Sequence, residues 1–174
     1  MSSDVKRPAF VMISTGKVLP AQLPAWLMGH VDLLQQVRQM VLDTERALSV
    51  VREAACSLID KVERSNSIIG VFMDEARPRM SRLVDHFIEH RNELPGDMAY
   101  AMGVDLTAVH ISVSNLAFRG RYMTILMGCV NEGKGEVAYE MVSEACPQQG
   151  ATLDWLATHI IGVKPETGDA VIEA

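Results

Sequence analysis

Small or apolar residues recur at alternating three- and four-residue steps between residues 34 and 62. This spacing is typical of one stripe along a helix that packs against a partner. One position per heptad on the opposite side is polar throughout. The pattern therefore predicts a long helix over residues 25–64 with one packed face and one solvent face. The stripe comprises Leu34, Val37, Val41, Thr44, Leu48, Val51, Ala55, Leu58 and Val62.

A second helical pattern follows a predicted break at residues 65–67, where Ser and Asn favour turns and caps. Its apolar residues step by three and four from Ile69 to Phe87, and Pro78 predicts a kink or a restart within it. Residues 93–96 end this helical half. The two helices form either an antiparallel hairpin or one kinked rod, and we favour the hairpin.

The period of the pattern changes after Val104. Val109, Ile111 and Val113 alternate with polar or small residues, which is the period of a strand. Residues 122–130 alternate in the same way and predict a second strand. Residues 9–14 and 155–163 predict two more strands, and an amphipathic helix is expected between Gly133 and Pro147.

In order, these elements are β, long α, β, β, α, β, which is the order of the ferredoxin-like arrangement. We therefore predict an α+β protein, with a long helical hairpin or coiled-coil region and a small ferredoxin-like (βαββαβ) sheet domain. The expected divisions are an N-terminal strand in residues 1–19, helices in 20–96, a ββαβ part in 97–164 and a flexible tail in 165–174. A plain helical bundle with an appended hairpin is the alternative.

Composition narrows the class of protein. The chain has 174 residues, of which 48% are hydrophobic and 22% charged, enough to bury a core in one domain. A net charge of −6 with scattered basic residues argues against nucleic acid or anionic lipid as a partner. The longest apolar stretch, residues 122–130, is shorter than the ~20 residues of a membrane helix. Three cysteines without a CxxC pair favour a reducing compartment, so we expect a cytoplasmic protein.

Two histidines suggest a metal site as one alternative. His86 and His90 are four residues apart, so on a helix they share a face and have the spacing that chelates a divalent transition metal. Glu89 is placed to supply a carboxylate. The sequence shows no further ligand pair, and histidines at a helix C-terminus also complement the helix dipole. We therefore expect no cofactor, with a metal-dependent sensor or enzyme as the alternative.

The predicted sheet offers a second candidate site. On adjacent strands, four polar or aromatic side chains would share one face and form a small-molecule site. These residues are His110, Ser112, Tyr122 and Thr124. No nucleophile elbow accompanies them, so an enzyme acting on a small molecule at this face is an alternative rather than the leading hypothesis.

The leading hypothesis is a non-enzymatic, homo-oligomeric protein for binding, assembly or regulation. Its helices would associate, and its α/β part would bind a ligand or a protein partner. The basis is the long packed stripe together with the absence of a catalytic motif. The predicted oligomer interface is Leu34, Val37, Val41, Leu48, Val51, Leu58 and Val62.

Overall fold

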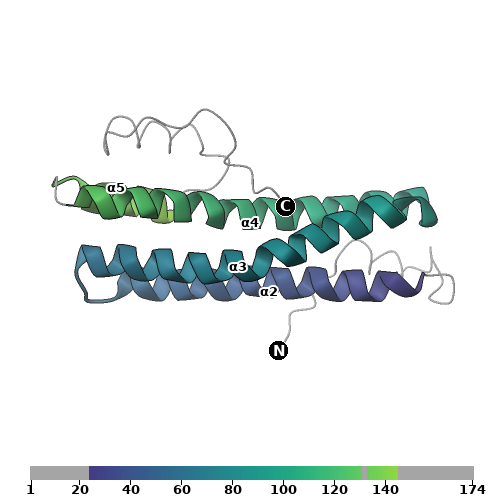
Figure 1. Cartoon of the computed structure of the whole chain (residues 1–174), viewed down its shortest axis with the longest axis horizontal. Coiled ribbons are helices and arrows are strands. Elements are labelled where there is room, and N and C mark those ends of the chain that lie inside the picture. The colour runs from purple at the N-terminus through teal and green to yellow at the C-terminus, as the bar shows by residue number, and fades with distance from the viewer. Residues whose placement is uncertain (1–23, 131–132, 145–174) are drawn as a thin grey trace.

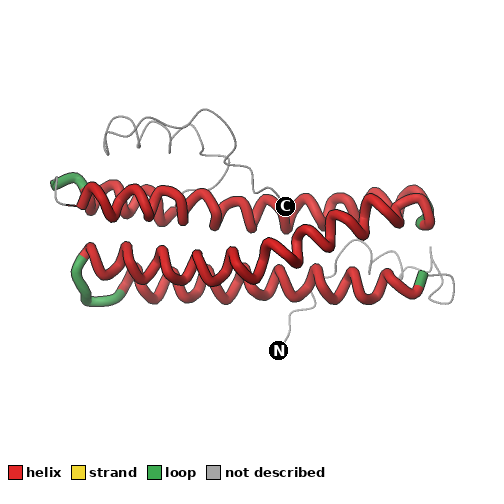
Figure 2. The backbone as a smooth tube through the Cα atoms, in the orientation of Figure 1, coloured by secondary structure: helices red, strands yellow, loops and turns green. Residues whose placement is uncertain are grey.

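A computed structural model describes residues 24–130 and 133–144 of the chain. These residues form four α-helices: α2 (Ala25–Glu53), α3 (Leu58–His90), α4 (Gly96–Cys129) and α5 (Gly135–Glu144). A short 3₁₀ turn, η2 (Arg91–Glu93), connects α3 to α4. Short loops link the helices, and the described residues contain no strand (Figure 2).

The three long helices run alternately up and down the long axis of the molecule, and α5 returns along the end of α4 (Figure 1). α3 packs against both α2 and α4, whereas α2 and α4 contact each other less. This up-and-down arrangement with short loops is typical of a helical bundle. The antiparallel pairing of α2 with α3 is a helical hairpin.

The turn of this hairpin lies at residues 54–57, so the predicted single helix over residues 25–64 and the break at residues 65–67 are wrong. The Ser57 hydroxyl accepts a hydrogen bond from the backbone N–H of Asp60 at 3.2 Å and caps the start of α3. Ser65, in the expected break, is instead buried within α3. The turn could not be recognised from the heptad stripe, because Leu58 and Val62 of α3 continue the three- and four-residue spacing of α2 beyond the turn.

α3 continues through Pro78 and bends near its middle, where this proline lies (Figure 1). A proline within a helix removes one backbone hydrogen bond and clashes with the preceding turn, which is a common cause of such bends. The bend therefore agrees with the kink predicted at Pro78. The helix is continuous through this proline and does not restart after it.

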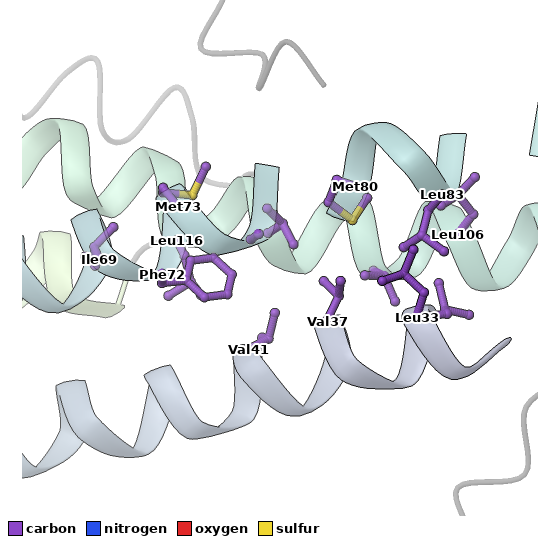
Figure 3. Close-up of a cluster of buried hydrophobic side chains, with 14 residues drawn as sticks. Leu33, Val37, Val41, Ile69, Phe72, Met73, Met80, Leu83, Leu106 and Leu116 are labelled. Carbon is purple, nitrogen blue, oxygen red and sulfur yellow. The ribbon is translucent and has the colours of Figure 1, made fainter. Parts of the chain in front are cut away.

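The core is shared by the three long helices, whose apolar side chains meet between them (Figure 3). A second cluster joins α3 and α4 to α5, and a third lies where α2 begins and α4 starts. The main cluster includes Leu33, Val37, Val41, Ile69, Phe72, Met73, Met80, Leu83, Leu106 and Leu116.

The predicted α+β class and the ferredoxin-like sheet are wrong, since the described chain is helical only. Two strands were expected at residues 109–113 and 122–130, but these residues lie within α4, apart from Val130, which caps its C-terminal end. Val109 and Val113 face the core while Ile111 between them points outward, yet all three are apolar. A helix that is apolar on two sides imitates the alternation of a strand. The strands expected within residues 1–19 and 155–163, and the tail, lie outside the described residues.

Candidate interaction surface

The predicted oligomer interface lies mostly inside the chain. Leu34, Val37, Val41, Val51 and Val62 are buried, and Leu48 and Leu58 pack against the same clusters. These side chains therefore already have partners on α3, α4 or α5. A surface for association has to be sought elsewhere on the bundle.

α4 carries a second four-three repeat on its outer side, away from the main core. We call these residues the outer stripe of α4. Its members are Val104, Ala108, Ile111, Asn115, Phe118, Tyr122 and Ile125. Towards its C-terminal end the stripe is covered by α5, since Tyr122 is buried against Ala138, Tyr139 and Val142. Phe118 and Ile125 pack against the same cluster.

The other half of the outer stripe is uncovered within the described chain. Val104 and Ile111 are 44% and 40% exposed, and Tyr100, one turn before Val104, is 76% exposed. Between Asp97 and Arg119 the one charged residue of α4 is Asp105, which is buried. The outer faces of α2 and α3 carry charges over the same length, such as Asp43, Arg46 and Glu75. An uncharged apolar face of this kind is typical of an interaction site.

The same helix is long and apolar enough to cross a membrane, judged by length and composition over Gly96–Met127. Only 39% of its most apolar 18-residue window is buried within the bundle. Asp105 and Arg119 of this helix are buried, and Arg119 forms an ion pair with Glu45 of α2. α4 thus packs as a bundle helix with one uncovered side.

His86 and His90 belong to an aromatic cluster at the end of the bundle where α2 begins and α3 ends. Trp26 stacks on His90 with ring centroids 4.8 Å apart and an interplanar angle of 22°. His30 of α2 lies 6.4 Å from His86, and the rings of His86 and His90 are 6.1 Å apart. The sequence analysis did not include Trp26 and His30 in this site. These two residues are four apart, as are His86 and His90. An antiparallel hairpin places one such pair beside the other.

Glu93 of η2 joins this cluster through hydrogen bonds. Trp26 Nε1 donates to Glu93 Oε2 at 2.8 Å, and His90 Nδ1 lies 2.9 Å from Glu93 Oε1. The bonds with His90 and with Trp26 lower the pKa of the Glu93 carboxyl. The cluster therefore connects the start of α2 with the end of α3.

The predicted metal ligands are close together but do not form a complete set. Glu89 Oε2 lies 3.7 Å from His90 Nε2, while His90 Nδ1 is paired with Glu93. Over residues 24–130 and 133–144, no group of three or more His, Cys, Asp or Glu side chains is arranged to hold a metal ion. Metal binding by His86, Glu89 and His90 stays a prediction.

The structure does not bring His110, Ser112, Tyr122 and Thr124 onto one face. Tyr122 is buried under α5, while the Ser112 hydroxyl donates to the Ala108 carbonyl at 3.1 Å. Thr124 Oγ1 lies 3.0 Å from both Asn66 Oδ1 and the Gly120 carbonyl. These four residues lie on one helix rather than on neighbouring strands, so their side chains point in different directions.

Comparisons with known proteins found no matching family model, no matching curated protein and no matching solved structure. The functional argument therefore depends on the residues themselves. Within the described chain, we take the uncovered half of the outer stripe as the candidate interaction surface, because it combines exposed apolar side chains with an absence of exposed charge.

Proposed function

We propose that the protein is a non-enzymatic helical bundle that associates with a second copy of itself through the uncovered half of the outer stripe of α4. The observation that carries the proposal is the uncharged, apolar surface from Tyr100 to Ile111. Full burial of one exposed aliphatic or aromatic side chain is worth about 1.5–3 kcal/mol, and Val104 and Ile111, at 44% and 40% exposed, would gain only the remaining part of this. Each copy would contribute several such side chains to the interface.

The character of the stripe favours a second copy over an unrelated partner. A two-fold interface brings the same surface patch of both subunits together, so a charged patch would repel its own copy. The outer stripe between Val104 and Phe118 has no charge to repel. Asn115 is its single amide, and the Oδ1 atom of this residue is buried inside the subunit.

The covered half of the stripe supports the same geometry. α5 already lies on the outer side of α4 around Tyr122, where Ala138 and Val142 pack against it. A helix therefore fits this side of α4 at packing distance. A helix from a second copy would extend the same contact towards Tyr100.

The test is the mass of the untagged protein by light scattering over a concentration series. We expect the wild type to be a dimer or a larger closed oligomer of the 19.1 kDa chain. Val104→Glu with Ile111→Glu should give a monomer, because association would bury two unpaired charges in each subunit. Circular dichroism should show unchanged helix content, since both side chains point away from the core.

The matched control adds the same charges to exposed apolar positions on α2. Leu42→Glu with Val50→Glu should leave the oligomer intact, because Leu42 and Val50 lie outside the outer stripe. A wild type that is monomeric at all concentrations would contradict the proposal. An unchanged mass in the folded Val104→Glu, Ile111→Glu variant would also contradict it.

Two other occupants of the stripe are distinguished by further measurements. If a monomeric wild type becomes oligomeric when the chain ends at Glu144, the segment 145–174 covers the stripe in place of a second copy. If the monomer instead binds neutral phosphatidylcholine vesicles and the Val104→Glu, Ile111→Glu variant does not, lipid covers it. Either result would overturn self-association.

A further inference from the structure

α5 ends beside the uncovered half of the outer stripe and points along it (Figure 1). Gly135, at the start of α5, lies close to the backbone of Val130. The Ser143 carbonyl, near the end of α5, accepts a hydrogen bond from Arg119 Nη1 at 3.2 Å. α5 therefore runs antiparallel to α4, and a chain that continues in this direction passes along the α4 residues that precede Arg119. Residues 145–174 start next to the surface that the described chain leaves open.

The chain beyond α5 is long enough to cover this surface. From Phe118 back to Val104, α4 extends for about 21 Å at a rise of about 1.5 Å per residue. A second helix of this length needs about 14 residues, roughly half of residues 145–174. The other half suffices for a connection from the end of α5.

Residues 151–163 match the open surface in character. Apolar residues recur in this range at three- and four-residue steps, the spacing of a helical stripe and an alternative to the strand predicted over residues 155–163. They are Leu153, Leu156, Ile160 and Val163. Asp154 is the one acidic or basic residue of the range apart from His159, and helical spacing places it on the side opposite the stripe. An apolar side without charge thus meets a half of the outer stripe that also has none.

We propose that residues 151–163 pack on the uncovered half of the outer stripe of their own chain and have to leave it before a second copy can bind. The inference rests on the proposed self-association, to which it adds an autoinhibitory contact. A segment tethered near its site has an effective concentration in the millimolar range, so it competes with a free partner. Since both subunits need a free stripe, a stripe that is free in about one chain in three weakens dimerisation roughly tenfold.

The first test compares the dimer dissociation constants of full-length variants by light scattering over a concentration series. Leu156→Asp with Ile160→Asp should release the segment, because its apolar side would then carry charges that cannot be buried without partners. We expect the dissociation constant to fall about tenfold. The control, Ala151→Asp with Thr158→Asp, adds the same charges to the opposite side of the segment and should leave the constant unchanged. An unchanged or higher constant in the Leu156→Asp, Ile160→Asp variant would overturn the competition.

Hydrogen exchange separates a failure of this inference from a failure of self-association. At a concentration where the wild type is monomeric, the amides of residues 151–163 should exchange about tenfold more slowly than in the Val104→Glu, Ile111→Glu variant, which lacks the apolar docking surface. Equal exchange in the two proteins would overturn the segment as the occupant of the stripe, whatever the oligomeric state. A wild type that is monomeric at every concentration but shows the difference would overturn self-association and support the segment as the occupant.

Discussion

Gly120 permits the close contact between α4 and α3. A Cβ placed on this residue would lie 2.7 Å from Cγ2 of Ile69, which is a buried, β-branched side chain. Such side chains have few alternative rotamers, so Ile69 has little freedom to move away. Gly70, the next residue of α3, is the opposite case, because a Cβ there meets nothing within 4 Å.

These two glycines should respond in opposite directions to the same change. We expect Gly120→Ala to lower the free energy of unfolding by about 1–3 kcal/mol through overpacking against Ile69. Gly70→Ala should raise it by about 0.5–1 kcal/mol, because alanine is the better helix former at an exposed, unobstructed position. Urea unfolding followed by circular dichroism measures both. Equal stability of the two variants would contradict this account.

Glu93 makes the stability of the Trp26–His90 cluster depend on pH. Its pKa is lowered in the folded chain, so it stabilises the fold above the pKa of an unfolded glutamate, about 4.3. That contribution is lost as the pH falls through the lowered folded value. We expect Glu93→Gln to reduce the urea midpoint at pH 7 and to make a smaller difference at about pH 3, which lies below the unfolded value. A difference that is the same at both pH values would show that the carboxylate charge has no role.

At the scale of the helix, the two sides of α2 differ sharply within one residue. Val51 is 2% exposed, whereas Val50 is 65% exposed. Val51→Asp should destabilise the bundle by several kcal/mol, roughly 3–5, because it buries an unpaired charge. Val50→Asp should change the stability by at most about 0.5 kcal/mol. Thermal unfolding of the two variants compares them directly, and a similar loss in both would show that α2 is oriented differently.

The sequence predicted helical structure where apolar residues are confined to one side, although it placed the turn between α2 and α3 at residues 65–67 instead of 54–57. The periodicity of α2 and α3, the kink at Pro78 and the amphipathic helix now seen as α5 all follow from such patterns. α4 could not be recognised, because Val104 and Ile111 on its outer side are as apolar as Val109 and Val113 on its inner side. Periodicity detects a contrast between faces, and α4 offers almost none.

The contacts of the candidate residues depend on which helices lie side by side, and the sequence pattern does not give this information. Sequence spacing placed His86 and His90 on one face, but it gave no reason to add Trp26, which comes sixty residues earlier. Nor did it pair Arg119 with Glu45, which lies 74 residues away. Such contacts become predictable only once the position of the hairpin turn is known.

At the scale of the whole molecule, two surfaces follow from the way α5 sits on the bundle. α5 covers one half of the outer stripe and leaves the other half open, and its residues Tyr139 and Ser143 form part of the wall of a cavity of about 220 Å³ that Arg119 also lines. The Ser143 carbonyl accepts a hydrogen bond from Arg119 of α4, and Glu144 forms an ion pair with Arg52 of α2. The position of α5 is therefore fixed by interactions at its end as well as by its apolar face.

The order of the helices also bears on how quickly the chain reaches this structure. α2 and α3, and then α3 and α4, are neighbours both in sequence and in space, so most of the core forms between segments joined by short loops. Chains dominated by such local contacts have low contact order and fold rapidly. The links from α2 to the distant elements span 74 residues for Glu45 and Arg119 and 92 for Arg52 and Glu144. Closing these larger loops costs more entropy, so we expect the contacts of α2 with α4 and α5 to form after those between helices that are neighbours in sequence.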